Sequence, residues 1–528
     1  MKPALFAFLL ASPAGAATQY MLIGYGQSLA LGHYGCGAIS TTQPYTGPGN
    51  QMILNGAGSS LIPLTDNGSE IGGNTCSGVN AWSSSVSYLV GAVVTNGGNT
   101  YQATTANTNQ APPNTAYWTQ VPNYEETPLT SAANNLTMLS NGTLFVIANT
   151  FGLGGTAISG LWRGTGPYSQ MISGVTAVNN LVKAAGNTLV VLGVVFTEGE
   201  QDFINGSNTY YADSMTIQSQ IQADIQAISG QTAAIPFFFS QLSSEMGGSI
   251  PSGLVPTCPD GLQACIGDPT GAAALTNSDK VSIAQWRLAH DYPNLFYLSG
   301  PKYQYPYGEA ALHLSNRGYN MLGAAIARAL KCVFVDHGTN CVGGVYPKTI
   351  YISGNVITLT ASTPNNLALT TAVNSSQDIL PLPVPYRNGA SDSIGMGFQV
   401  FQTTGGAQSS IGITSVSVSG PTVTITLAST PTGTNLRLAY AFEGQRYSLS
   451  PTLNCSPTAT SCNGNTLGGT LGSQGALHGN IRTVADYTDL NGDPVYHWMV
   501  HFNEPILTQS IQPAPAVKSG GVCSGCRF

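Results

Sequence analysis

A serine and a histidine, far apart in the chain, have the residue types and settings of a nucleophile and its base. Ser28 lies in YGQSLALG, where the apolar run Tyr20–Gly24 breaks into small residues. His313 lies in GEAALHLSNRGYN, just before a segment that Ser315 or Asn316 can cap as a helix. A histidine accepts a serine's proton readily because its pKa lies near neutrality. A tight turn at Ser28 and a surface histidine at position 313 are the simpler alternatives.

Two further stretches offer carboxylates and backbone donors. VVFTEGEQDF runs from a strand-like segment directly into Glu198, Glu200 and Asp202. Carboxylates this close repel one another unless cations or a functional site offset them, although a solvated turn is the alternative for Glu198. NTFGLGGTAISG opens a second strand into Gly154 and Gly155, where a backbone N–H can approach a ligand closely, although such a pair usually forms only a turn.

The order of the expected elements predicts where these residues meet. Apolar runs alternate with segments of helical spacing from Gln19 to about Cys332. The expected strands are Tyr20–Gly24, Thr143–Ala148, Leu189–Phe196, Ile235–Ser240 and Leu295–Leu298, and the expected helices are Tyr168–Ala185, Tyr210–Ile228, Asp279–His290 and Ser315–Leu330. This alternation predicts an α/β fold with a parallel sheet covered by helices. Ligands bind at the carboxyl ends of such strands, and Ser28 lies just past the first one.

Two regions break the alternation. The segment 81–121 has short strand-like runs, Gly-Gly and Pro-Pro turn signals and several aromatic residues, which predicts a small β module inserted in the first long crossover. After Cys332, apolar and polar residues alternate between Gly, Pro and Asn turns, which predicts a β-sandwich. The expected organisation is a signal peptide at 1–17, an α/β domain at 18–332 with the insert at 79–123, a β-rich domain at 333–507 and a tail at 508–528.

The composition excludes some partners. Only 7% of the 528 residues are charged, the net charge is −7, and no basic run is present, which argues against nucleic acid as a partner. Lys2, the apolar run Ala4–Ala11 and the small residues Ala14-Gly15-Ala16 are typical of a secretory signal peptide, so we expect a secreted or periplasmic protein. No later stretch is apolar over the roughly 18 residues that a membrane span needs.

The ten cysteines favour disulfides, because an exported chain meets oxidising conditions. Four close pairs stand out, which are Cys258 with Cys265, Cys332 with Cys341, Cys455 with Cys462 and Cys523 with Cys526. Cys36 and Cys76 remain and flank one region, so we expect five local bridges, although spacing alone does not fix the connectivity. A zinc site at Cys523 and Cys526 is the alternative, but no second pair or histidine cluster accompanies them.

Taken together, four motifs resemble those of SGNH-type hydrolases, and more narrowly the sialate O-acetylesterase-like carbohydrate esterases of family 6. GYGQSLA, GLGGTAISGLW, TEGEQD and HLSNRGYNMLG occur in the order of that family, between about Gln19 and Cys332. The resemblance implies a flavodoxin-like, three-layer parallel sheet and a serine esterase that needs no cofactor. It also implies that Ser28 is the nucleophile and His313 the base.

The resemblance further assigns the oxyanion donors and the acid. The N–H groups of Ser28 and Gly155 match the donors, with Gly154 as the near alternative, and the side-chain amide of Gln201 matches a third. The wider family often has an aspartate three residues before the histidine, where this chain has Ala310. Glu200 matches the acid of the carbohydrate-esterase branch, and Glu309 is the alternative acid. A Ser–His dyad without an acid is the remaining possibility.

The insert resembles the chitin-binding type of carbohydrate-binding module, families 5 and 12. The pattern that carries this resemblance is Trp82, Tyr88, Gly91, Val94, Tyr101 and Trp118. Exposed aromatic faces stack on sugar rings, and Tyr117 and Trp118 are the preferred candidates for this role. Trp82 and Tyr101 fit better as members of a small β core.

These inferences predict a secreted carbohydrate O-acetylesterase that acts on acetylated polysaccharides or oligosaccharides, with the module raising the local concentration of substrate. Two alternatives stand beside it. One is a glycan-binding surface or phage-like protein with a vestigial hydrolase fold, favoured by Ala310, the insert and the large β-rich region. The other is an esterase of lipid or other small esters, for which no long apolar lid segment is visible in the sequence.

Overall fold

The structure is a computed structural model, and it describes most of the chain. The described residues are 17–46, 49–53, 60–67, 76, 79–88, 90–205, 207–243, 281–306, 313–338, 341–364, 367–371, 395–441, 479 and 481–507. Almost all of the expected signal peptide, the whole expected tail and the alternative acid Glu309 therefore lie outside the described residues. In these ranges, no helix is long and apolar enough to cross a membrane.

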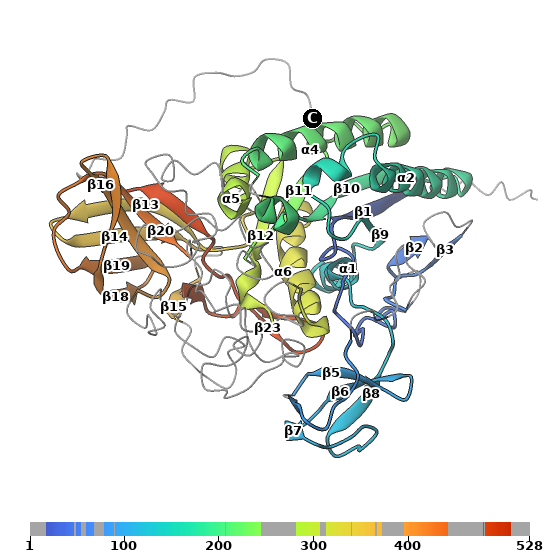
Figure 1. Cartoon of the computed structure of the whole chain (residues 1–528). Helices are drawn as coiled ribbons and strands as arrows, with labels where there is room; N and C mark the ends of the chain where they lie inside the picture. The colour runs from blue at the N-terminus through green and yellow to red at the C-terminus, as the bar shows by residue number, and fades with distance from the viewer. Residues whose placement is uncertain are drawn as a thin grey trace, which may run out of the picture.

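A seven-stranded sheet forms the centre of the fold (Figure 1). Its five longest strands, which are parallel to one another, are β1 (Thr18–Gly26), β9 (Val146–Gly152), β10 (Thr188–Thr197), β11 (Phe237–Gln241) and β12 (Phe296–Pro301). Their spatial order is β12-β11-β10-β1-β9, and the short strands β2 (Gln51–Ile53) and β3 (Leu61–Pro63) extend the sheet beyond β9. Numbered among the parallel strands, this is the order 2-1-3-4-5 read from β9, one of the two common doubly wound orders.

Helices cover both faces of this sheet, because alternate residues of each strand point to opposite sides. Met21 and Ile23 pack into the core under the helices α2 (Gly166–Ala184), α4 (Tyr210–Ser229) and α5 (Val281–Asp291). Leu22 packs into the core on the other face, under α1 (Pro128–Leu139) and α6 (Asn316–Phe334). All three side chains are fully buried. A strand buried on both faces reads as a continuous apolar run, which is why the α/β class was predictable.

All five expected strands and all four expected helices are present, with one displaced strand. The second strand was expected at Thr143–Ala148 but is found at Val146–Gly152. The polar residues Asn149 and Thr150 are buried inside it, and Asn149 hydrogen-bonds the main chain of Ile53 on the neighbouring strand β2. Polar residues inside a strand look like loop residues in the sequence, even when their side chains are hydrogen-bonded. This explains why the expected strand ended too early.

The insert folds as a small β unit, drawn at the bottom of Figure 1. Its strands are β4 (Ser87–Tyr88), β5 (Val93–Asn96), β6 (Asn99–Ala103), β7 (Asn107–Thr108) and β8 (Trp118–Val121), in two antiparallel sheets. Its own apolar core contains Tyr88, Val94, Tyr101 and Trp118. One link to the α/β domain is the side chain of Gln102, which donates to Asn316 at the start of α6, 3.4 Å away.

The region after Cys332 forms antiparallel sheets, drawn mainly at the left of Figure 1. One sheet has the order β13-β14-β19-β18 and another β17-β16-β20-β24, while β15-β21 and β22-β23 are two-stranded. The bounds are β13 (Tyr346–Ser353), β14 (Val356–Ser362), β15 (Leu369–Thr371), β16 (Phe398–Thr404), β17 (Ala407–Ile411), β18 (Ile413–Ser419), β19 (Thr422–Leu427), β20 (Thr434–Tyr440), β21 (Ile481–Thr483), β22 (Tyr487–Thr488), β23 (Pro494–Val495) and β24 (Phe502–Pro505). Among the described residues after the end of α6, the expectation of a β-rich region is confirmed.

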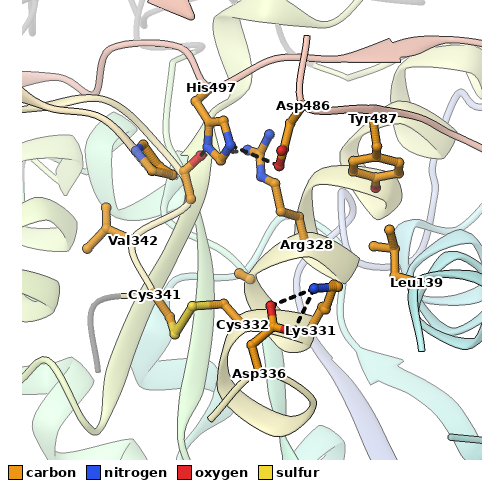
Figure 2. A pocket seen from close by; sticks show the side chains of 13 residues that line it. Leu139, Arg328, Lys331, Cys332, Asp336, Cys341, Val342, Asp486, Tyr487 and His497 are labelled. Atoms are coloured by element: carbon orange, nitrogen blue, oxygen red, sulfur yellow. Dashed lines mark hydrogen bonds and ion pairs between the residues drawn. A yellow bond between two sulfur atoms is a disulfide. The ribbon is translucent and has the colours of Figure 1, made fainter. Parts of the chain in front are cut away.

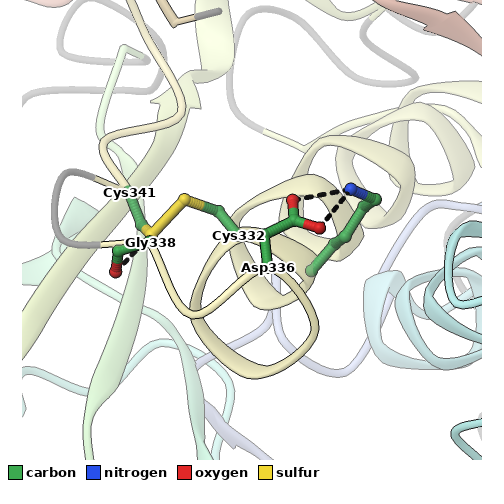
Figure 3. The surroundings of a disulfide bond; sticks show 5 residues. Cys332, Asp336, Gly338 and Cys341 are labelled. Atoms are coloured by element: carbon green, nitrogen blue, oxygen red, sulfur yellow. Dashed lines mark hydrogen bonds and ion pairs between the residues drawn. A yellow bond between two sulfur atoms is a disulfide. The ribbon is translucent and has the colours of Figure 1, made fainter.

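One of the expected disulfides is formed, between Cys332 at the end of α6 and Cys341 (Figure 3). Cys36 and Cys76 are free thiols, so the bridge expected there is absent. Cys76 hydrogen-bonds to Cys36, and this contact together with burial raises the pKa of the Cys36 thiol. A raised pKa keeps the thiol protonated and unreactive. The other three expected pairs lie outside the described residues.

A cavity of about 260 Å³ lies beside this disulfide, at the end of α6 remote from His313 (Figure 2). His497 lies beside it, and its ring contacts the carbonyl oxygen of Gly343 through Nδ1 at 2.7 Å and the carboxylate of Asp486 through Nε2 at 3.1 Å. The buried side chain of Arg328 donates to the carbonyl of Gly343 as well. Burial, and next the charge of Arg328, lower the pKa of His497 to about 4.

This buried histidine predicts a loss of stability in acid. In the unfolded chain this histidine has a pKa near 6.5. Between that pH and about pH 4, it is therefore protonated in the unfolded chain but neutral in the folded protein. Stability is therefore full above pH 6.5, and acidification to pH 4 removes about 3 kcal/mol from the free energy of unfolding. Urea denaturation across this range measures the effect. The variant His497→Gln should show a shallower acid slope, and an unchanged slope would contradict the prediction.

Candidate active site

The end of β1 places Ser28 at the carboxyl edge of the sheet. Gly26 has a φ of +153°, and a β-carbon there would lie 2.0 Å from the carbonyl oxygen of Thr197 on β10. Only glycine permits so close an approach. The chain turns immediately afterwards, with the N–H of Gln27 donating to that same carbonyl at 3.2 Å. The tight turn and the half-buried serine at the end of the strand, which were alternatives in the sequence, are thus parts of one arrangement.

His313 reaches this serine from the start of α6. Ser315 is the N-cap of the helix, and its side chain accepts from the N–H of Gly318 at 3.1 Å, as its sequence setting predicted. The imidazole Nε2 of His313 lies 2.8 Å from Oγ of Ser28, although 285 positions separate them. The side chain of Asn316 adds a second anchor by donating to the carbonyl of Gly37, 2.8 Å away. The structure therefore brings the predicted nucleophile and base into hydrogen-bonding contact.

In the structure, Glu200 pairs with Lys302 and Gln27. One carboxylate oxygen pairs with the ammonium of Lys302, and the other accepts from the side-chain amide of Gln27 at 2.6 Å. Both ends of the ion pair are buried. Of the expected chain of contacts Ser28–His313–Glu200, the contact between Ser28 and His313 is formed, and the role of Glu200 as the acid stays a prediction. With Glu309 outside the described residues, the acid that orients His313 stays a prediction.

The two neighbouring carboxylates are accommodated in different ways. Glu198 is fully buried, and burial together with Asp202 and Glu200 nearby raises its pKa well above the usual range. Asp202 also has a raised pKa, chiefly from burial. One oxygen of Asp202 accepts from the N–H of Ile158 at 2.7 Å, which links the short helix α3 (Glu200–Ile204) to the segment after the glycine pair. The cluster is thus a buried network rather than a solvated turn.

The predicted oxyanion donors differ in their surroundings. A β-carbon on Gly154 would lie 3.6 Å from Cβ of Ser28, so this glycine borders the nucleophile directly. Gly155 has a φ of +66° and faces open space. The side-chain amide of Gln201 donates to Oδ1 of Asn205 within the same helical turn, at 2.9 Å. The amide has a second N–H beside the one in this bond, and the donor roles of Gln201 and of the Gly155 N–H stay predictions.

Two rings from the loop after Ser28 flank the base. Tyr34 stacks on His313 with ring centroids 4.7 Å apart, and its backbone has a φ of +65°, which is rare for a residue with a side chain. His33 meets His313 edge-on at 6.5 Å. The buried carboxylate of Glu125 holds both, because Oε1 accepts from the N–H of Tyr34 at 3.2 Å and Oε2 lies 3.5 Å from Nδ1 of His33. Strained backbone held by surrounding contacts is common at functional sites.

The aromatic residues of the insert do not form the expected exposed platform. Trp118 has only 2% of its surface exposed, its ring packs against Tyr88, and its indole N–H donates to the carbonyl of Gln110. The stacking role expected of Trp118 is therefore wrong, because the ring belongs to the core of the insert. Tyr101 is also buried, as its alternative assignment to the core implied. Trp82 and Tyr117 are half-buried and pack against the same core.

Sequence reasoning missed four residues of this site. Gln27 and Lys302 form the partners of Glu200, while His33 and Glu125 lie beside the serine–histidine pair. Lys302 follows an expected strand at the same sheet edge as Ser28, and a lysine there among so few charged residues was a usable signal. For Glu125 the sequence held no such signal, because its position next to His33 depends on the path of the chain after the insert.

Gly154 offers a direct test of the site. A methyl group added there would meet His33 Nε2 at 3.4 Å and Cβ of Ser28 at 3.6 Å, which are ordinary contact distances, so the fold should tolerate it. It would nevertheless occupy space beside the nucleophile, and misplacing a reacting group by about 1 Å costs roughly 100-fold in rate. We expect Gly154→Ala to lower kcat/KM for an aryl acetate about 100-fold with an unchanged Tm.

The matched control is Gly166→Ala, at a glycine that begins α2 and whose β-carbon would meet nothing within 4 Å. This variant should keep full activity. Equal activity of the two variants would place Gly154 outside the site.

Comparisons with known proteins give only distant likenesses. No family model and no curated protein sequence matches the chain. Similar solved structures include a carbohydrate acetylesterase from Xanthomonas citri, with 11% identity, coverage of 92% of this chain and 80% of that one, and a TM-score of 0.44. NanS has 12% identity over 61% of this chain and 99% of its own, with a TM-score of 0.33. A protein from Arabidopsis thaliana has 15% identity over 60% and 99%, with a TM-score of 0.31. Identities and TM-scores this low carry no functional argument, so the activity has to be inferred from the residues of the site.

Proposed function

We propose that this protein is a serine-dependent carbohydrate O-acetylesterase of the SGNH type. The observation that carries the proposal is the 2.8 Å contact between Oγ of Ser28 and Nε2 of His313 at the carboxyl edge of a doubly wound parallel sheet. A nucleophile and its base within hydrogen-bonding reach, at the edge where such folds bind ligands, support acyl transfer.

The proposed reaction proceeds through an acyl-enzyme. Oγ of Ser28 attacks the acetyl carbonyl carbon while its proton moves to Nε2 of His313. The tetrahedral intermediate collapses as the ester C–O bond breaks, and His313 returns the proton to the departing sugar oxygen. Water then attacks the acetyl-serine with the same histidine as base, which releases acetate and restores Ser28. The N–H groups of Ser28 and Gly155 are the proposed oxyanion donors.

The proposed substrate class is an acetylated glycan outside the cytoplasm. The four motifs that resemble the family 6 carbohydrate esterases support it, as does the expected signal peptide. An uncharged polar surface, expected where only 7% of residues are charged, suits a neutral polyhydroxylated substrate. The insert is proposed to assist through half-buried Trp82 and Tyr117 rather than through Trp118.

The test is acetate release by the purified full-length protein. Acetylated xylan, acetylated chitin oligomers, O-acetylated sialic acids and an aryl acetate are offered in parallel, and acetate is measured directly. A fluorophosphonate probe should label the protein, and peptide mapping should place the label on Ser28. A protein that releases no acetate from any substrate and takes no label would be a vestigial hydrolase, and the proposal would be wrong.

A further inference from the structure

His33 has a distinct position in the site beside the serine–histidine pair. A β-carbon built on Gly154 would lie 3.4 Å from Nε2 of His33 and 3.6 Å from Cβ of Ser28. Gly154 thus lies between Nε2 of His33 and the side chain of Ser28. The side chain of His33 is 26% exposed, so Nε2 lies at the edge of the site and not in the core.

The protonation of His33 follows from its neighbours. Burial, and next the adjacent His313, lower the pKa of His33, which favours a neutral ring. Nδ1 faces the carboxylate of Glu125 at 3.5 Å, and Glu125 itself is only 1% exposed. The negative charge of this carboxylate favours the ring proton on Nδ1, and a neutral ring protonated there presents Nε2 as an acceptor. Within the described part of the chain, no side chain donates to that nitrogen.

The loop that carries His33 is built to fix this orientation. Tyr34, the next residue, is held at a φ of +65° while its N–H donates to Glu125 and its ring stacks on His313. The main-chain carbonyl of His33 accepts from the hydroxyl of Tyr319 on α6 at 2.9 Å. The helix that follows the base and the buried Glu125 therefore fix the position of His33 together.

We propose that Nε2 of His33 accepts a hydrogen bond from a free hydroxyl of the substrate, next to the acetylated carbon, and so selects esters of polyols over simple esters. This inference rests on the proposed esterase function and adds the group that recognises the alcohol side. His33 takes no proton from Ser28, since His313 occupies that place, and it acts as a specificity-determining residue. A hydroxyl-bearing alcohol gains the contact, whereas an aryl acetate has no group to offer.

The test compares two substrates in three variants. The substrates are a monoacetylated xylo-oligosaccharide with a free neighbouring hydroxyl and an aryl acetate. His33→Leu removes the acceptor, whereas His33→Gln places an amide oxygen at a similar reach. The control is His290→Leu, because His290 also pairs with a carboxylate, Asp291 at 2.9 Å, but is exposed on α5.

For His33→Leu we expect kcat/KM on the oligosaccharide to fall about tenfold, which is the size of one hydrogen bond. The loss should appear mostly in KM, because the bond is present in both the bound substrate and the transition state. Activity on the aryl acetate should stay within twofold of wild type. His33→Gln should recover part of the loss, and His290→Leu should behave as wild type on both substrates.

Three outcomes would overturn the inference. An equal fall on both substrates would place His33 in the chemistry common to all esters, and no fall on either would leave it without a role in recognition. A wild-type protein that cleaves the aryl acetate but no acetylated sugar would also overturn it, while the serine esterase chemistry would stand. A wild-type protein that cleaves neither would instead overturn the proposed function itself.

Discussion

Replacing Ser28 by alanine is expected to reduce kcat about 10⁴-fold or more on every ester that the protein hydrolyses. The hydroxyl that lies 2.8 Å from Nε2 of His313 is the only proposed nucleophile, and alanine removes it without adding volume. His313→Ala should cost about as much, and the double variant should lose little more, because a nucleophile and its base act as one unit. Acetate release under saturating aryl acetate measures all three variants.

The chain contains a matched control for this prediction. Oγ of Ser243 lies 2.8 Å from Nε2 of His501, and Nδ1 of that histidine contacts the carbonyl oxygen of Ala441 at 2.7 Å. Both Ser243 and His501 are fully buried, so no substrate can reach this second serine–histidine pair. Ser243→Ala should keep kcat unchanged and lower stability by about 1 kcal/mol for the lost hydrogen bond. A loss of activity in Ser243→Ala equal to that in Ser28→Ala would contradict the assignment.

The contrast between the two pairs shows which parts of the site the sequence can predict. Ser28 and His313 stand at element ends, one after a strand and one before a capped helix, and elements are readable from apolar periodicity. Parallel topology then brings their ends to one sheet edge. The pair Ser243–His501 joins a strand end to the β-rich region, and no local pattern in the sequence marks that contact.

The sequence offered Lys302 as a candidate cation at this sheet edge, but it did not show that Glu200 is its partner. Three carboxylates after one strand required a compensating cation, and this need was visible in the sequence. Which cation supplies it depends on β12 lying two strands away from β10, with Lys302 directly after it. Sheet order is set by packing of both faces rather than by any residue near Glu200. The family resemblance led instead to His313 as the partner.

The burial of Trp118 shows a further limit. In the sequence, an aromatic residue that stacks on sugar and one that fills a small core look alike, because both stand among alternating polar residues. A module as small as this insert has few apolar residues, so its large rings are drawn into the core. Only the observed 2% exposure of Trp118 distinguishes the two roles.

The second large effect concerns stability, and it follows from the ion pair beneath the nucleophile. Lys302 is fully buried and Glu200 is 3% exposed, so neither charge is solvated. Lys302→Met keeps a similar side-chain length but removes the ammonium that pairs with the Glu200 carboxylate in the interior. Removing one partner of a buried pair costs about 3–5 kcal/mol. We expect the free energy of unfolding, measured in urea at pH 7, to fall by this amount.

A second ion pair, which water can reach, distinguishes the effect of burial from the effect of losing an ion pair. Lys331 pairs with Asp336 at 2.6 Å, but the side chain of Lys331 is 31% exposed and that of Asp336 is 47% exposed, so water reaches both. Lys331→Met should cost less than about 1 kcal/mol, because water replaces the lost partner. The double variant Lys302→Met with Glu200→Gln should recover most of the lost stability, since no uncompensated charge remains in the interior. If Lys302→Met lowers the free energy of unfolding no more than Lys331→Met does, the buried ion pair does not stabilise the fold. The hydrogen bond between Glu200 and the side chain of Gln27, next to Ser28, would then need another explanation.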